Sequence, residues 1–329
     1  MKSSLKKKKI AIVGASGYIG SKLVLKLSEF DCSILRISRN KDKLKPLAST
    51  LANIMDFEVK YDDIKWEDIL DNVDLVYYLS SQTSTYIAEK NIIEDYNSSV
   101  KPIVELLKYC EKINNNLTII FSSAVTICGL TESLPVDETF KDNPVTIYDV
   151  HKLLIENYIK FYCSKSFIKG TSLRLANVYG PGTESSSSDR GILNKMISRA
   201  MEGHDLSVYG KGNYLRDYIY LDDVVDALLK AYEYIDKTNG NHYIISSGEG
   251  NTIKEAFELI TKKVSEILEI HTKVNQASIP DSLALIEYRN FIGNSDSFMA
   301  HTKWKPTVNL NEGIKSTIKE FKGIKKWLD

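Results

Sequence analysis

Short apolar runs alternate with amphipathic stretches over the first half of the chain, from Lys9 to about Asn177. The runs are hydrophobic at consecutive positions, as in strands that are buried on both faces of a parallel sheet. The stretches between them carry apolar residues at helical spacing, so each predicts a helix that covers one face of the sheet. This alternation predicts an α/β fold, a doubly wound parallel sheet with helices on both sides.

The predicted strands of this part are Ile10–Val13, Ser33–Ile37, Phe57–Tyr61, Leu75–Leu79, Leu117–Phe121 and Thr171–Leu175. Helices between them are predicted at Ile19–Phe30 and Pro102–Ile113. The lysine run Lys6–Lys9 precedes the first strand and predicts a solvated N-terminal tail.

The pattern changes after Asn177, where a serine run from Ser185 to Ser188 predicts a mobile loop. Further helices are predicted at Ile192–Gly203, Asp222–Tyr234 and Ile253–Ile270, and a strand at Tyr243–Ile245. No repeat or linker separates independent domains. We expect residues 8–180 with about 215–247 to form a large sheet domain, and residues 181–214 and 248–329 to form a smaller lobe that closes over it.

Composition argues against several classes of protein, namely those that bind nucleic acid, membranes or metals and those that are secreted. The chain has 329 residues, 43% of them hydrophobic, and its 43 Lys and Arg balance 43 Asp and Glu, which argues against nucleic acid or an anionic membrane as a partner. The run Ile10–Val13 is too short for a signal peptide and no stretch is long enough to span a bilayer, so we expect a cytoplasmic protein. The four cysteines are expected to be reduced and mostly buried: Cys32, Cys110, Cys128 and Cys163. Neither these nor the histidines have metal-site spacing, so no metal is expected.

The segment from Ile10 to Gly20 is predicted to be a strand, a glycine turn and the start of a helix. Gly14 allows the tight turn, Gly17 lets the backbone approach a pyrophosphate, and Gly20 lets the helix pack close to the strand. A pyrophosphate then lies at the helix N-terminus, where unpaired N–H groups and the helix dipole favour negative charge. In this context the glycines predict a Rossmann-type site for a nicotinamide dinucleotide.

The end of the second predicted strand distinguishes NAD from NADP, because an acidic residue there binds the ribose hydroxyls whereas an arginine accommodates a 2′-phosphate. The chain has Ser38 and Arg39 at this place and no carboxylate. A guanidinium beside a hydroxyl suits a phosphate, so NADP is predicted; the alternatives are NAD and a merely solvated Arg39. Asp63 and Ile64 stand where an adenine edge would lie, and Asp63 is either an acceptor for its amino group or a solvated acid.

Tyr148 and Lys152 are four residues apart on a predicted helix and therefore share one face. A nearby ammonium lowers the pKa of a tyrosine, which makes the phenol usable for moving a proton on and off a substrate hydroxyl. The same spacing, interpreted as incidental, occurs at Tyr18/Lys22, Tyr61/Lys65 and Tyr86/Lys90. Tyr148 differs because its helix follows the strand Leu117–Phe121, whose carboxyl end opens onto the cofactor crevice.

Five motifs follow one another in a fixed order: Gly14-x-x-Gly17-x-x-Gly20, Phe121-Ser-Ser-Ala-Val-Thr-Ile-Cys-Gly129, Tyr148-x-x-x-Lys152, Arg174-Leu-Ala-Asn-Val-Tyr-Gly-Pro-Gly182 and Arg216-Asp-Tyr-Ile-Tyr-Leu-Asp-Asp223. In this order they resemble an extended short-chain dehydrogenase/reductase of the NAD-dependent epimerase/dehydratase family, which acts on nucleotide sugars. The resemblance covers nearly the whole chain. It implies a nucleotide-diphosphate sugar as substrate and a homodimer.

The resemblance implies that Tyr148 is the catalytic acid–base, and that Lys152 tunes it and holds the nicotinamide ribose. With the glycine turn, it implies these cofactor-binding residues: Gly14, Ser16, Gly17, Tyr18, Ile19, Gly20, Ser38, Arg39, Asp63, Ile64, Leu79, Ser80, Ser81, Tyr148 and Lys152.

A hydroxyl that binds the sugar oxygen is also implied, but its usual position, counted back from Gly129, is Ala124 in this chain. Ser123 is chosen in its place, because some relatives keep the serine ahead of this position, and Thr126 is the alternative. A second departure is Ser99, which stands where the family commonly has asparagine.

For the substrate, the resemblance places Asn177 near the sugar diphosphate, and Arg216 and Arg289 on the diphosphate itself. The chemistry agrees, because a guanidinium binds phosphate bidentately. The structural alternative for Arg216 is an ion pair with Asp217 or Asp222, and a purely structural ion pair is the alternative for Arg289 as well.

Sugar 4,6-dehydratases of the family carry an Asp-Glu pair where this chain has Val125 and Thr126, and relatives that epimerise C3 and C5 carry a cysteine at Thr126. Hydride transfer at a single carbinol, C4, therefore remains. Arg39 favours a 4-ketoreductase acting on an NDP-4-keto-6-deoxyhexose, because reduction draws on NADPH; a 4-epimerase is the alternative and a 4,6-dehydratase is disfavoured. A non-catalytic NADP-sensing protein would lack the Tyr148/Lys152 pair.

Overall fold

The structure is a computed structural model that describes residues 2–47, 49–61, 63–113, 117–183 and 191–325. Its helices are α1 (Lys2–Leu5), α2 (Tyr18–Leu27), α3 (Thr85–Lys90), α4 (Ile92–Asp95), α5 (Lys101–Ile113), α6 (Ile147–Ser164), α7 (Ile192–Met201), α8 (Leu221–Glu233), α9 (Ile235–Thr238), α10 (Ile253–Leu268), α11 (Asp296–Thr302) and α12 (Leu310–Lys325). Its strands are β1 (Lys9–Val13), β2 (Ser33–Ser38), β3 (Asn53–Glu58), β4 (Leu75–Tyr78), β5 (Thr118–Ala124), β6 (Lys169–Leu175), β7 (Asn177–Tyr179), β8 (Leu206–Tyr209), β9 (Leu215–Tyr220), β10 (His242–Ile245), β11 (Gly250–Thr252) and β12 (Val274–Ala277). Single turns are η1 (Lys41–Lys43), η2 (Trp66–Asp68), η4 (Val125–Cys128) and η5 (Leu285–Tyr288), all 3-10, and η3 (Tyr96–Val100), which is π-helical. The predicted serine loop lies outside the described residues.

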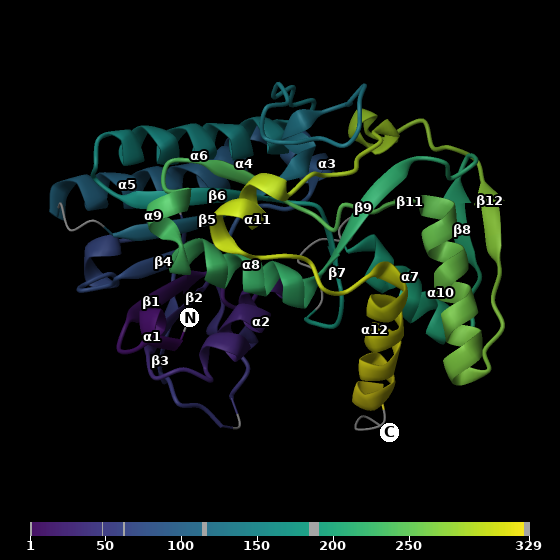
Figure 1. Cartoon of the computed structure of the whole chain (residues 1–329), viewed down its shortest axis with the longest axis horizontal. Coiled ribbons are helices and arrows are strands. Elements are labelled where there is room, and N and C mark those ends of the chain that lie inside the picture. The colour runs from purple at the N-terminus through teal and green to yellow at the C-terminus, as the bar shows by residue number, and fades with distance from the viewer. Residues whose placement is uncertain (1, 48, 62, 114–116, 184–190, 326–329) are drawn as a thin grey trace.

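A seven-stranded sheet in the order β10-β6-β5-β4-β1-β2-β3 lies between helices in the left-hand part of the molecule in Figure 1. All its strand pairs are parallel. From β3 to β6 the order is that of the Rossmann fold, so the predicted α/β class is confirmed. The strand order reverses between β1 and β4, and a crevice therefore opens outside their carboxyl ends.

Helices cover both faces of this sheet, as the apolar runs predicted. Ile119 and Phe121 of β5 pack in a core with α5 and α6, whereas Ile120 packs on the opposite face with α2 and α8. A third core joins α7, α10 and α12 with β8 and is set apart from the sheet (Figure 1). Strand β10 returns to the edge of the large sheet from beyond α7 and α8, and pairs there with β6.

The third strand is the element that the sequence misplaced. It was predicted at Phe57–Tyr61, but β3 is Asn53–Glu58. The strand begins earlier because Asp56, a residue that interrupts the apolar pattern, lies on the pleated surface beside Arg36 of β2 and accepts two hydrogen bonds of 2.6 Å from its guanidinium. β3 is an edge strand with exposed positions, so hydrophobicity alone does not reveal it.

The lysine run is a second correction. Lys9 is the first residue of β1, and Lys8 forms an ion pair of 2.7 Å with Asp74, just before β4. Leu5 ahead of the run is buried in the core. Lys8 and Lys9 therefore join the amino ends of two strands, whereas Lys6 and Lys7 are exposed, so the second half of the run is not the solvated tail that was predicted.

The four cysteines are free and buried, as predicted. Burial raises the pKa of the Cys110 thiol to about 12, which keeps it protonated and unreactive. No helix in the described part of the chain is long and apolar enough to cross a membrane. In the same part, no group of three or more His, Cys, Asp or Glu side chains is placed to hold a metal ion.

Candidate active site

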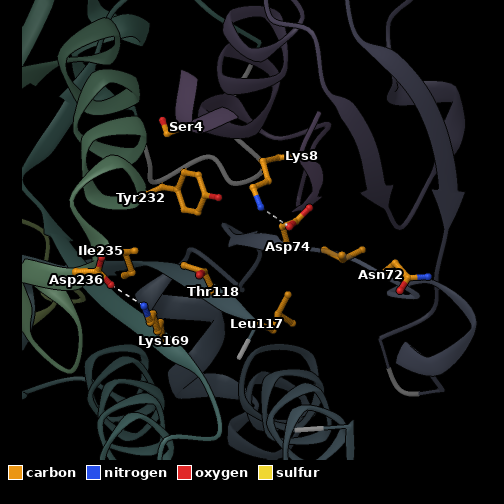
Figure 2. A pocket seen from close by; sticks show the side chains of 11 residues that line it. Ser4, Lys8, Asn72, Asp74, Leu117, Thr118, Lys169, Tyr232, Ile235 and Asp236 are labelled. Atoms are coloured by element: carbon orange, nitrogen blue, oxygen red, sulfur yellow. Dashed lines mark hydrogen bonds and ion pairs between the residues drawn. The ribbon is translucent and has the colours of Figure 1, made fainter. Parts of the chain in front are cut away.

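An active site could lie at either end of the strands, the amino edge or the carboxyl edge of the sheet. A cavity of about 650 Å³ opens at the amino ends of the strands, and Figure 2 shows the pairs Lys8–Asp74 and Lys169–Asp236 on its wall. The second pair is 2.6 Å apart, so both ammonium groups already have carboxylate partners. The predicted catalytic and cofactor residues lie at the opposite, carboxyl edge, and the site is built there.

The glycine turn forms a cradle between β1 and α2. Gly14 has a φ of 90°, which favours glycine, and a Cβ added there would lie 3.1 Å from the backbone nitrogen of Ser80, after β4. A Cβ on Gly20 would clash with the Gly14 carbonyl oxygen. Gly17 caps α2 without a side-chain hydrogen bond, which leaves the first N–H groups of the helix open to an anion. The cradle therefore fits a dinucleotide pyrophosphate.

Tyr18 begins α2, but its side chain is engaged elsewhere. Its hydroxyl donates to the Gly180 carbonyl oxygen at 2.7 Å and accepts from Asn194 of α7 at 3.1 Å, and burial raises its pKa. Lys22, one turn later, pairs with Asp222 at 2.9 Å, so this Tyr/Lys spacing is incidental, as interpreted. The Tyr18 side chain thus joins the start of α2 to Gly180 and to α7. Ile19, the next cofactor residue predicted, is half-buried beside the core.

The end of β2 is polar. Ser38 Oγ lies 2.7 Å from Ser16 Oγ of the glycine turn, so these two predicted cofactor residues are in contact. Arg39 is exposed, and its guanidinium lies 5.9 Å from the centre of the Tyr61 ring. Arg39 and Ser81 both line a second cavity, of about 120 Å³, beside the ends of β2 and β4.

The remaining predicted cofactor residues differ in burial. Leu79, Ser80 and Ser81 follow β4 and are half-buried against the glycine turn. Ile64 is buried, whereas Asp63 is exposed.

The Tyr148/Lys152 pair lies on α6, above the carboxyl end of β5. Lys152 is only 5% exposed, and its ammonium donates to the Ser122 carbonyl oxygen at 2.8 Å. The same ammonium lies 4.7 Å from the centre of the Phe121 ring and 5.7 Å from that of the Tyr148 ring. Tyr148 is half-buried. The pair therefore combines a fixed positive charge with a phenol that keeps access to solvent.

The structure distinguishes the hydroxyls of Ser123 and Thr126, the two that were considered for binding the sugar oxygen. Thr126 donates to the carboxylate of Asp149, which is fully buried and also accepts from Thr146 at 2.7 Å. The Thr126 hydroxyl is therefore held by the start of α6. Ser123 lies on the same face of β5 as Phe121, is 5% exposed, and its hydroxyl has no hydrogen-bond partner among the described residues. These contacts favour Ser123.

The three predicted substrate residues meet in one cluster. Arg289 donates to the side-chain oxygen of Asn177 at 3.4 Å, and Arg216 donates to the backbone carbonyl of Arg289. Arg216 also donates to the Glu287 carbonyl oxygen at 2.8 Å and to its carboxylate at 3.3 Å. Two guanidinium groups and one amide thus lie together between β7, β9 and the segment after η5.

The alternative partners suggested for Arg216 are wrong. Asp217 accepts backbone hydrogen bonds from Ser247 at 2.8 Å, Gly248 at 3.0 Å and Gly293 at 3.2 Å, while burial raises the pKa of its carboxyl. Asp222 pairs with Lys22 instead. The two acids hold loops and a helix together, and Glu287 is the carboxylate that contacts Arg216.

One contact between the two parts of the chain was missed by the sequence analysis. The Tyr86 hydroxyl of α3 accepts from the backbone of Ala284 at 3.2 Å and so ties α3 to the segment that leads to Arg289. The two residues are 198 positions apart. The sequence offered only the Tyr86/Lys90 spacing, which does not indicate this contact.

The chain is similar to known proteins in sequence and in fold. The model of the NAD dependent epimerase/dehydratase family matches residues 10–246. Over 319 residues the chain is 26% identical to a putative UDP-glucose 4-epimerase of Methanocaldococcus jannaschii, covering 95% of this chain and 98% of that protein. It is also 26% identical over 335 residues to a dTDP-4-dehydro-6-deoxyglucose reductase of Escherichia coli, covering 96% of this chain and 98% of that protein. The solved UDP-glucose 4-epimerase of Thermotoga maritima, with UDP-glucose, superposes with a TM-score of 0.82 at 26% identity, covering 98% of this chain and all of that one.

Proposed function

Because the chain belongs to the NAD-dependent epimerase/dehydratase family, we propose that it transfers a hydride at C4 of the sugar in a nucleotide-diphosphate sugar. One observation carries this proposal: Tyr148 and Lys152 lie together above the end of β5, at the same sheet edge as the glycine turn. A non-catalytic sensor has no use for this pair. The cofactor, when bound, supplies or accepts the hydride.

The residues of the chain then have separate tasks. Tyr148 moves the proton on and off the C4 oxygen, and the Lys152 charge stabilises the phenolate and binds the nicotinamide ribose. Ser123 donates a hydrogen bond to the same sugar oxygen. Its buried hydroxyl supports this role, because a buried polar group needs a partner that the described residues do not supply.

We propose NADP as the preferred cofactor, with NAD as the alternative that the family name supports. Arg39 carries the proposal, since it is exposed at the end of β2 and that strand end has no carboxylate. Arg39→Ala is expected to weaken NADP binding roughly tenfold, because a charge-assisted hydrogen bond to phosphate is lost at an exposed site. Binding of NAD is expected to stay the same, and titration calorimetry with both cofactors measures the difference.

Arg199→Ala is the matched control, because Arg199 is also exposed but lies on α7 and donates to the Asp205 carbonyl oxygen. It should change neither affinity. Equal NADP affinity of wild type and Arg39→Ala would remove the proposed preference and leave NAD as the cofactor.

The diphosphate is assigned to the cluster of Asn177, Arg216 and Arg289. Both arginines are at least nine-tenths buried, and a guanidinium has the planar donors that bind phosphate oxygens well, although those of Arg216 also hold the carbonyl oxygens of Arg289 and Glu287. Residues 8–180 with about 215–247 are proposed to bind the dinucleotide, and residues 181–214 with 248–329 to close over the sugar nucleotide.

For the reaction itself, we favour a 4-ketoreductase of an NDP-4-keto-6-deoxyhexose, on the strength of Arg39. A 4-epimerase is the second candidate, because relatives of equal identity carry both names. Dehydration is disfavoured, since Val125 is apolar and Thr126 is bonded to Asp149. Incubation with a panel of nucleotide sugars and 4-keto sugars, followed at the nicotinamide absorbance band, separates them: net loss of NADPH indicates the reductase, and sugar interconversion without net loss indicates the epimerase.

A homodimer is proposed as the working form. Exposed apolar side chains lie on neighbouring helices, namely Ile92 and Ile93 on α4 and Val150 and Phe161 on α6, and a second copy would cover them. Sedimentation velocity is expected to show a dimer that Phe161→Glu weakens. A monomeric wild type at micromolar concentration would contradict this.

A further inference from the structure

A buried pair of side chains, Asp95 and His151, joins the catalytic helix to the π-helical turn η3. His151 Nδ1 is hydrogen-bonded to Asp95 Oδ2, and the two residues are 8% and 3% exposed. The ring of Tyr96, the first residue of η3, packs edge-on against His151 at 5.9 Å. His151 directly precedes Lys152, so the two side chains leave α6 about 100° apart around its axis. We propose that the Asp95–His151 pair positions Lys152 in the cofactor crevice, a role that rests on the proposed function.

The pair belongs to a series of hydrogen-bonded contacts that links the loop after β4 to the end of β5. Ser99 of η3 accepts from the backbone of Gln82 at 3.0 Å, in the loop after β4 that carries the predicted cofactor residues. Asp95 precedes η3 and binds His151, and Lys152 binds the end of β5. Both ends of the series therefore lie at the carboxyl edge of the sheet. Turns of π-helix are rare and are often found at functional sites.

The pair is suited to fixing a position because each partner needs the other. A buried carboxylate is costly without a hydrogen-bond donor, and Asp95 lies where α4 passes directly into the π-helical turn η3, an irregular turn within a helix that continues into α5. Loss of the histidine donor therefore lets α4 and η3 shift against α6. A displacement of about 1 Å at a catalytic group costs roughly 100-fold in rate, so a small shift of Lys152 is measurable.

Two substitutions separate the hydrogen bond from the bulk of the ring. His151→Asn keeps an N–H donor near the position of Nδ1, whereas His151→Leu keeps an apolar side chain and removes the donor. His242→Leu is the matched control: His242 of β10 also contacts α6, where its Nδ1 lies 2.8 Å from Lys160, two turns beyond Lys152. Burial lowers the pKa of His242 to about 4, so that ring is neutral.

The first measurement needs neither cofactor nor substrate. The apo variants are treated with an acylating reagent, and the modification rate of Lys152 is followed by mass spectrometry. The buried Lys152 of the wild type should react slowly. His151→Leu is expected to speed this reaction at least about tenfold, as for a group released from a buried contact, while His151→Asn and His242→Leu react like the wild type.

The second measurement is turnover. His151→Leu is expected to lower kcat roughly 10- to 100-fold with the KM for the nucleotide sugar little changed, and His151→Asn to restore most of kcat. An unchanged acylation rate in His151→Leu would overturn the proposal, and so would an equal loss of kcat in His242→Leu, which would mark a general loss of stability. Failure of the proposed function is seen separately, as a wild type without C4 turnover or a Tyr148→Phe variant with full turnover, and the acylation rates still decide the role of the pair.

Discussion

Tyr148→Phe is expected to lower turnover of the nucleotide sugar by roughly 10²- to 10⁴-fold, the usual contribution of a general acid–base group. The substitution removes only the hydroxyl, so the ring should remain 5.7 Å from the Lys152 ammonium and the cradle should be unchanged. Cofactor affinity is therefore expected to stay close to that of the wild type. Steady-state kinetics and a cofactor titration on the same preparation measure both quantities.

Tyr162→Phe is the matched control for this substitution. Tyr162 lies on the same helix, and its hydroxyl donates to Glu111 at 3.4 Å, far along α6 from the crevice. Its loss should leave turnover unchanged. A Tyr148→Phe variant as active as Tyr162→Phe would refute the acid–base role and, with it, the proposed chemistry.

The second large effect is expected in stability, at Arg174. Its fully buried guanidinium donates to Asp142 at 2.6 Å and to the fully buried Glu156 of α6 at 2.7 Å. Arg174→Met would leave the Glu156 charge without its cation in the core, at a cost of about 3–5 kcal/mol in the free energy of unfolding. Chemical denaturation followed by circular dichroism measures this difference.

Two further variants distinguish the charge effect from lost packing. Arg36→Met makes the same change in β2, but the partner of Arg36 is Asp56, which is about a third exposed and stays solvated. The loss there should be clearly smaller. Adding Glu156→Gln to Arg174→Met removes the orphaned charge and should recover part of the stability. Equal losses at both arginines would mean that buried charge is not the cause.

The sheet was predictable because strands buried on both faces leave continuous apolar runs, as at β1 and β5. The same logic failed at β3, since an edge strand needs no such run and Asp56 is acceptable there once Arg36 is known to lie beside it. The lysine run was misread for a related reason. Lys8 appears solvated until Asp74 is placed next to it by the pairing of β1 with β4.

The candidate site was predictable where its residues are close in the sequence, because their spacing within one turn or one helix sets how they lie in the structure. Gly14 to Gly20 share one turn, and Tyr148 and Lys152 share one helix face. Asp95 and His151 are 56 positions apart in the sequence, so no local sequence pattern predicts their contact. Likewise, the sequence alone could not decide whether Ser123 or Thr126 binds the sugar oxygen. The structure distinguishes them, because the Thr126 hydroxyl is already hydrogen-bonded to the buried Asp149.

The late return of β10 to the sheet has a consequence for protein engineering. Because β10 covers one side of β6, any shortened version that ends before His242 exposes a row of unpaired backbone N–H and C=O groups along β6. Such an open edge is a template on which a second chain can add a strand, so a shortened protein would tend to aggregate even if its cofactor cradle were intact. The layer formed by α7, α10 and α12 can therefore be exchanged only piece by piece, with β10 kept in place.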